Sequence, residues 1–186
     1  IDPVLDYEPF GATISHASIE RLFAFVRTHD LTVRLVLDTH VHADHMTGSY
    51  AVKEHFHVSN GIGAGFLSSQ HYFSHFYGIN INDYAHAYDV LLDHNERIQA
   101  GSITITALHV PGHTPSCTAY LIDNNLFSGD AIFQPTLGCG RADFPGGSAT
   151  SLFHSIKDHI FSLPDDTIIW VGHDYPERPE GAQAST

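Results

Sequence analysis

Apolar residues recur at spacings of three and four in two stretches of the chain, which is the spacing of one helix face. This pattern predicts helices over residues 15–30 and 149–163. Their expected inward faces are Ile19, Leu22, Phe23 and Val26 in the first and Leu152, Phe153, Ile156 and Ile160 in the second. A third helix is expected over residues 47–56.

Short runs of apolar and β-branched residues predict strands. These runs cover residues 33–38, 57–60, 97–98, 103–110, 118–122, 126–127 and 167–171. The alternating glycines Gly61, Gly63 and Gly65 predict an irregular turn region after the second run. Residues 1–4 resemble the end of a strand, so we expect further strands to precede them.

Strands followed by a helix occur twice along the chain, which predicts two β-sheets packed together and covered by helices. The expected fold class is therefore α+β, with a single domain over residues 1–186. At this length, with 42% hydrophobic and 16% charged residues, the chain can bury a proper core.

Charge and hydropathy argue against two classes of partner. The formal net charge is −13, so the surface repels phosphate backbones and we expect no nucleic acid. No apolar run approaches the roughly 20 residues that span a bilayer, and we expect no membrane. Cys117 and Cys139 do not make a disulfide framework, so we expect a reducing compartment, the cytoplasm or the mitochondrion.

The middle section, residues 70–92, is rich in aromatic and histidine side chains. Core packing and ordinary surface positions explain most of them, although some could form a wall of a substrate pocket. These side chains are His71, Tyr72, Phe73, His75, Phe76, Tyr77, Tyr84, His86 and Tyr88.

The densest group of candidate metal ligands follows the strand expected over residues 33–38. His40, His42, Asp44 and His45 form an HxHxDH pattern there. Three more candidates, His113, Asp130 and His173, each follow an apolar, strand-like run. Imidazole and carboxylate groups at such positions suit zinc, iron or manganese.

Taken in order, these seven residues resemble the signature of the metallo-β-lactamase superfamily. The resemblance covers nearly the whole chain and implies an αββα sandwich, here apparently without its first N-terminal strands. In dinuclear members, it implies one metal on His40, His42 and His113, a second on Asp44, His45 and His173, and Asp130 as a bridge. Two Zn(II) ions with a bridging water would then hydrolyse a thioester, lactone or β-lactam, with Asp44 or the bridging hydroxide handling protons.

A second branch of the superfamily implies different chemistry. Persulfide dioxygenases oxidise glutathione persulfide with one Fe(II) on two histidines and a carboxylate, which are His40, His113 and Asp130 here. Residues 138–144, GCGRADF, resemble the GCGRxDF segment of that branch, and the matching arginine, Arg141, implies a contact with glutathione. Glyoxalase II enzymes instead carry GCGKxxEG-like residues and a C-terminal helical domain, which we do not expect after His173. We therefore favour the dioxygenase reading.

Two points remain open at the level of sequence. A non-catalytic metal-binding protein could keep the same motif, and a blocked pocket beside the metal would distinguish it. The expected partner is otherwise a small molecule, a glutathione derivative, and a homodimer is compatible with the sequence. One departure from the family is Ser116, which stands where many relatives have glycine and is expected to alter the turn behind His113.

Overall fold

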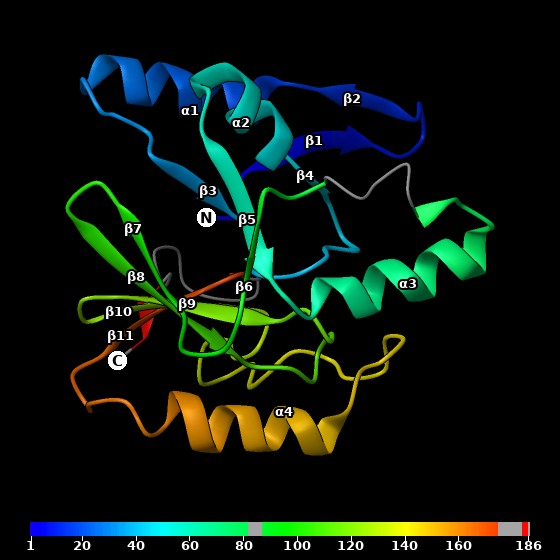
Figure 1. Ribbon diagram of the computed structural model, residues 1–186, viewed down its shortest axis with the longest axis vertical. Coiled ribbons are helices and arrows are strands. Elements are labelled where there is room, and N and C mark those ends of the chain that lie inside the picture. The colour runs from blue at the N-terminus through cyan, green and yellow to red at the C-terminus, as the bar shows by residue number, and fades with distance from the viewer. Residues whose placement is uncertain (82–86, 175–183, 186) are drawn as a thin grey trace.

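Two groups of β-strands lie between helices in the computed structural model of the chain, which describes residues 1–81, 87–174 and 184–185 (Figure 1). The helices are α1 (Ala17–Thr28), α2 (Ser49–Phe56), α3 (Phe66–Tyr77) and α4 (Ala149–Ser155), and α4 continues as a π-helical turn over Ile156–Ile160. The strands are β1 (Val4–Glu8), β2 (Thr13–Ser15), β3 (Leu35–Leu37), β4 (Met46–Thr47), β5 (Ser59–Gly63), β6 (Val90–Leu92), β7 (Arg97–Ala100), β8 (Ile103–His109), β9 (Thr118–Ile122), β10 (Asn125–Gly129), β11 (Ile168–Val171) and β12 (Ala184–Ser185).

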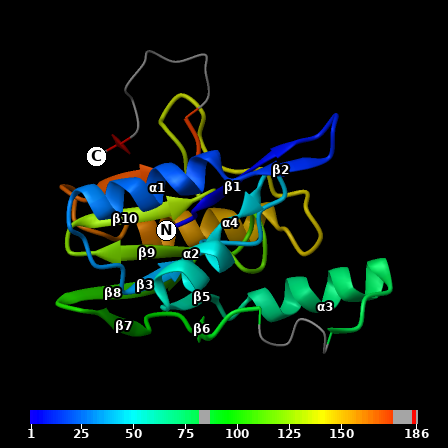
Figure 2. The ribbon, with the colours of Figure 1, turned by 90° about the horizontal axis from the view of Figure 1, so that it is seen from above.

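The larger sheet has the order β12-β11-β10-β9-β8-β7 within the described residues. Its neighbours are antiparallel except β10 and β11, which run parallel. The facing side of the molecule holds the parallel sheet β3-β5-β6 and the antiparallel sheet β2-β1-β4. Helices α1 and α2 cover this side, and α4 covers the larger sheet (Figures 1 and 2).

Three hydrophobic clusters fill the interfaces between these layers. The first lies between α1, α2 and β3, the second between the two main sheets, and the third between the larger sheet and α4. The buried members are Ile19, Phe23, Val36 and Val52; then Leu37, Leu92, Ile105, Ala107 and Tyr120; then Leu108, Val110, Cys117, Ala119, Leu126, Ala131, Leu152 and Ile160. Three apolar interfaces between four layers confirm the predicted α+β sandwich.

The two main sheets approach very closely at Gly63, which explains a wrong prediction. Gly61 and Gly63 were expected in an irregular turn, but both lie in β5. A Cβ atom on Gly63 would stand 1.9 Å from Thr118 Oγ1 in β9, so only glycine lets the sheets meet here. Gly65 alone keeps a boundary role, as the residue before α3.

Several element boundaries also differ from the predictions. Residues 1–4 do not end a strand, because β1 begins at Val4 and pairs with β2 and β4. Thr47 belongs to β4, so the third predicted helix begins later, at Ser49. Within the predicted inward helix faces, Leu22 is 37% exposed and Phe153 is 61% exposed. The expected strand at 57–60 is shifted, because His57 ends α2 in a left-handed conformation.

Helix α3 was not predicted, and it lies at the edge of the molecule (Figure 2). Phe66, Phe73 and Tyr77 do recur at helical spacings, but the buried residue of the helix is Ser69, so the segment lacks the buried apolar face that marks a core helix. Of the aromatic and histidine residues of the middle section, Tyr84 and His86 lie outside the described residues. Among the helices of the described residues, none is both long and apolar enough to cross a membrane.

Candidate metal centre

All seven predicted ligands follow the ends of strands and converge at one edge of the sandwich. His40 and His42 follow β3. Asp44 and His45 complete the same loop before β4. His113 follows β8, Asp130 comes directly after β10, and His173 is the second residue after β11; these three face the loop from the other sheet.

Three of the seven form a buried group. His40, His113 and Asp130 expose only 2%, 6% and 8% of their surface. The Nε2 atoms of His40 and His113 lie 3.8 and 3.6 Å from Asp130 Oδ2. One ligand atom from each residue lies within 4.8 Å of the other two, which is close enough for one ion to be shared.

A second group lies beside the first and is more exposed. His42, Asp44 and His45 also offer ligand atoms within 4.8 Å of one another. His173 joins the two groups, because its Nε2 is 3.2 Å from Asp44 Oδ2 and 3.5 Å from Asp130 Oδ2. His173 therefore links Asp130, in the buried group, to Asp44, in the more exposed group.

Hydrogen bonds to the far side of two buried imidazoles fix which nitrogen is available. His113 Nδ1 donates to the backbone oxygen of Arg141 over 2.6 Å, which leaves Nε2 as the lone-pair atom. His40 Nδ1 lies 2.9 Å from Thr39 Oγ1, whose own proton goes to Asp2 Oδ2. The Thr39 hydroxyl must therefore accept a hydrogen bond from His40 Nδ1, and the Nε2 atom of His40 is also unprotonated. Such outer partners are what orient histidine ligands in metal sites.

The same logic applies to the other two histidines of the loop. His42 Nε2 donates to Asp2 Oδ1 over 3.1 Å, and His45 Nδ1 donates to Asp44 Oδ2 over 3.1 Å. Their remaining nitrogens, His42 Nδ1 and His45 Nε2, are buried and have no hydrogen-bond partner among the described residues. Buried polar atoms rarely stay unpaired, and a cation would satisfy both. The donor set therefore fits one or two transition-metal ions.

Electrostatics keep the buried group in the state that a metal requires. Burial lowers the pKa of His40 to about 4, so its imidazole is neutral near pH 7. Burial by itself would raise the pKa of Asp130, but the hydrogen bond from His173 and the nearby histidines lower it below its ordinary value. A neutral imidazole beside an ionised carboxylate binds a divalent cation without first losing a proton.

Asp2 belongs to the centre, although no sequence motif pointed to it. Its carboxylate accepts hydrogen bonds from Thr39 N at 2.7 Å, from the Thr39 hydroxyl at 2.8 Å and from His42. Burial acts to raise the pKa of Asp2, but these bonds lower it overall. Asp38, beside it, is buried and accepts from the hydroxyls of Thr47 and Tyr88. Asp2 is 37 residues away from Thr39, so no local pattern links the two.

Ser116 ties the two ligand loops together. Its buried hydroxyl accepts from Val41 N, between His40 and His42, over 3.0 Å. It also lies 3.0 Å from the Thr114 hydroxyl, next to His113. The expected effect of Ser116 on the turn thus takes the form of a cross-link between the turn and the HxHxDH loop.

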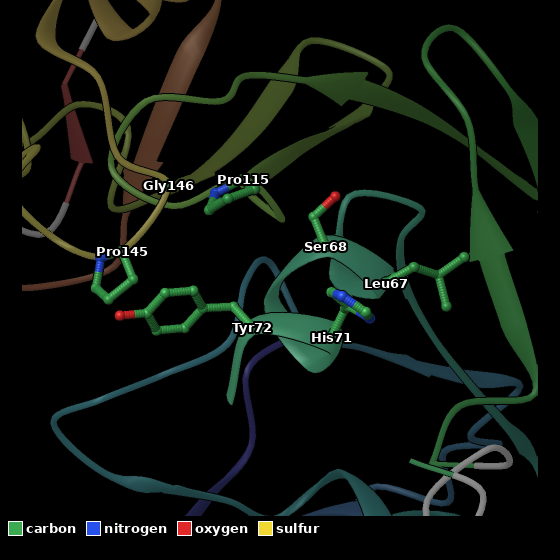
Figure 3. A pocket seen from close by; sticks show the side chains of 7 residues that line it. All are labelled: Leu67, Ser68, His71, Tyr72, Pro115, Pro145 and Gly146. Carbon is green, nitrogen blue, oxygen red and sulfur yellow. The ribbon is translucent and has the colours of Figure 1, made fainter. Parts of the chain in front are cut away.

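Two pockets open directly onto the ligands. The larger, about 750 Å³, is lined by Asp44, His113, Asp130 and His173 and by the segment that contains Cys139, Arg141 and Phe144. The smaller, about 330 Å³, lies on the other side of His113, against α3. A third groove follows the neighbouring flank of α3, where Tyr72 extends toward Pro145 (Figure 3). The ligands are therefore accessible to a small molecule.

Arg141 lies at the pocket wall but its guanidinium is already engaged. It is 66% exposed and holds Asp143 through two bonds of 2.6 Å, from Nε and from one terminal nitrogen. Its guanidinium also lies 4.9 Å from the ring centre of Phe144. The hydrogen bond from Arg141 lowers the pKa of Asp143 to about 2. A substrate carboxylate would have to compete with Asp143 for the same two guanidinium N–H groups of Arg141.

An αββα sandwich with histidine and aspartate ligands at its strand ends defines a class of metal-dependent proteins. The family model of the Metallo-beta-lactamase superfamily matches residues 11–173, and the chain belongs to that superfamily. The curated relative Glyoxylase B2 of Dictyostelium discoideum is 34% identical over 97% of this chain and 63% of its own length. The mitochondrial Persulfide dioxygenase ETHE1 of Homo sapiens is 31% identical over 94% of this chain and 58% of its own length.

Among solved structures, ETHE1 from Myxococcus xanthus matches with a TM-score of 0.75 and 30% sequence identity, over 99% of this chain and 66% of that one. The chain spans less than two thirds of the length of the two curated relatives named above. Their names differ, so these comparisons show the family and not the reaction.

Proposed function

We propose that the chain is the metal-binding domain of a glutathione-persulfide dioxygenase that uses one Fe(II) on His40, His113 and Asp130. The observation that carries this proposal is the buried group that these three residues form, separate from His42, Asp44 and His45. Two imidazoles and one carboxylate leave coordination positions open, which is the ligand set of iron oxygenases. The similarity to two proteins named ETHE1, one of them a persulfide dioxygenase, supports the same reading.

The residues around the larger pocket suit a substrate with a polar, anionic arm. Arg141 and its guanidinium fork could bind a glutathione carboxylate with two parallel hydrogen bonds, if Asp143 releases it. The persulfide end would then point toward His113 and Asp130, which line the inner wall. Asp44, half exposed at the same wall, would accept the persulfide proton in this proposal.

Fe(II), when bound, supplies the redox chemistry by which dioxygen oxidises the outer sulfur of the persulfide. Dioxygen and one water together provide the three oxygens of sulfite, and the inner sulfur leaves as the thiol of glutathione. The chain's own contribution is to hold the sulfur beside the ligand group and to keep His40 and His113 in one tautomer. A substrate of this kind belongs in a reducing compartment, the cytoplasm or the mitochondrion.

A dinuclear zinc hydrolase of a thioester or lactone is the second candidate. The buried, unpartnered His42 Nδ1 and His45 Nε2 favour it, because a second ion would bind both groups of ligands. In that case Asp130 would bridge the ions, and Asp44 or a bridging hydroxide would handle the proton. The relative named Glyoxylase B2 is consistent with this reading.

A non-catalytic metal-binding protein is less well supported. Its distinguishing feature would be a blocked pocket, whereas pockets of about 750 and 330 Å³ adjoin the ligands. Volumes in this range hold small substrates.

The test pairs metal analysis with two assays on protein purified without added metal. We expect one iron per chain and oxygen uptake on glutathione persulfide, with both lost in His113→Ala. The control His154→Ala, an exposed histidine of α4, should keep both. Two zinc ions per chain, hydrolysis of an acyl-glutathione and no oxygen uptake would overturn the dioxygenase proposal and favour the hydrolase.

A further inference from the structure

Helix α3 presents one face to the smaller pocket beside the ligands. Ser69, Phe73 and Tyr77 line it at intervals of four residues, which places them in one row about 12 Å long. The exposed fraction of these side chains increases along the row: Ser69 is buried, Phe73 is half-buried and Tyr77 is 64% exposed. Ser69 therefore marks the closed end of the pocket and Tyr77 its mouth.

The opposite wall comes from the loops that carry the ligands. Val41 and Ala43 of the HxHxDH loop face the helix, together with Phe144 and Pro145. His42 and His113 also line the pocket, so it reaches the candidate metal centre itself. Apart from these two histidines, no ionisable group other than the Tyr77 phenol lines it among the described residues, and most of its surface is aliphatic or aromatic.

The pocket on the Arg141 side has the opposite character. Asp44, Asp130, Arg141 and His173 give it a charged lining. The two pockets share Ala43, His113 and Phe144, so they meet at the ligand His113. A substrate with its reacting atom at this junction could therefore extend a polar arm to one side and an apolar arm to the other.

We propose that the α3 pocket binds the uncharged alkyl or aryl substituent of a further class of ligand, S-substituted glutathiones, because glutathione persulfide itself carries no group beyond its outer sulfur. The volume of about 330 Å³ is at the lower end of small-ligand sites, and aromatic walls are their usual lining. Tyr77, at the mouth of the pocket, is 64% exposed, and the aromatic rings that its own ring contacts among the described residues, Phe73 and Phe76, belong to α3 itself. The binding of the glutathione part on the Arg141 side rests on the proposed function, whereas the apolar pocket beside α3 does not.

Binding of S-alkylglutathiones to the metal-loaded protein tests this pocket without turnover, because these thioethers have neither a persulfide nor a thioester. Titration calorimetry with S-methyl-, S-propyl- and S-hexylglutathione measures the gain in affinity per carbon. We expect two- to fourfold tighter binding for each added methylene, since a fully buried methylene is worth about fourfold. Equal affinities across the series would overturn the proposal.

Two variants of α3 and one control locate the effect. Phe73→Ala should flatten the dependence on chain length, and Ser69→Leu, which fills the closed end, should weaken S-hexylglutathione but not S-methylglutathione. Leu67→Ala is the control, because Leu67 is 52% exposed and lines the groove on the neighbouring flank (Figure 3). An unchanged chain-length dependence in both Phe73→Ala and Ser69→Leu would contradict the assignment.

The two proposals fail in different ways. Turnover of glutathione persulfide with a flat chain-length dependence would overturn the α3 pocket and leave the proposed function standing. A steep dependence without oxygen uptake on glutathione persulfide would overturn the proposed function and support the pocket.

Discussion

At the scale of single residues, Ser116 shows how the centre is held by side chains that bind no metal. Its hydroxyl satisfies Val41 N in one ligand loop and contacts Thr114 in the other. Ser116→Ala would leave the half-buried backbone N–H of Val41 without this partner and loosen both loops. We expect metal affinity to fall about tenfold, the lower end of the effect of outer partners in metal sites.

Competition with a chromogenic chelator measures that affinity. Ser162→Ala is the matched control, because its exposed hydroxyl donates only to the backbone oxygen of Asp158. Equal metal affinities for Ser116→Ala and the unmodified chain would show that the cross-link does not hold the ligand loops.

At the scale of elements, Asp6 in β1 fastens the start of α1. Its carboxylate accepts from Ser18 N at 2.7 Å and from the Ser18 hydroxyl at 2.6 Å, and these bonds lower the pKa of Asp6. A lowered pKa means that the stabilisation is present above the ordinary value of 3.8 and is lost as the pH falls through the folded value. Asp6→Ala should therefore lower the melting temperature at pH 7.

The pH dependence separates this effect from a general loss of packing. The difference in melting temperature between Asp6→Ala and the unmodified chain should shrink as the pH falls below about 3.8. Asp165→Ala, which removes another exposed aspartate, is the matched control. A difference that stays constant from pH 7 to pH 3 would contradict the capping role of Asp6.

Elements with a clean period were predictable, and elements built on long-range contacts were not. The strands over residues 103–110 and 118–122 alternate or concentrate apolar residues, and the structure has β8 and β9 there. The strand expected over residues 57–60 overlaps only the start of β5, and the rest of β5 was missed because Gly63 serves a close contact with Thr118, far along the chain. Helix α3 was not predicted, because its apolar residues face the pocket and the solvent as well as the body of the protein.

The same limit applies to the centre. The seven motif ligands could be predicted from the sequence, because each motif follows an apolar run that is recognisable as a strand. Asp2 and Ser116 act through folded contacts with residues 37 to 75 positions away, which no local pattern encodes. The pairing of the Arg141 guanidinium with Asp143 could not be predicted either, since it depends on the conformation of the loop that carries both residues.

At the scale of the whole molecule, the centre joins the two sides of the sandwich. His40 and His42 come from one side, and His113, Asp130 and His173 from the other. A metal ion would therefore link the layers and stabilise the folded state in proportion to its affinity. We expect exhaustive chelation to lower the melting temperature, and replacement of the metal to restore it.

Thermal unfolding by circular dichroism checks this, with the chelated His113→Ala variant as reference. That variant lacks a ligand that contacts Asp130, so chelation should change its melting temperature far less. A melting temperature of the unmodified chain that is the same before and after chelation would argue against a structural link through the metal.

The central claim is that the buried group at the strand ends is a metal centre. A crystal structure of the purified protein, with anomalous data at the iron and zinc edges, tests it most directly. We predict a metal peak about 2.0–2.2 Å from His40 Nε2, His113 Nε2 and an Asp130 carboxylate oxygen, the usual range for nitrogen and oxygen ligands of zinc. A metal-loaded crystal with the ion bound elsewhere, and these three groups unligated, would contradict it.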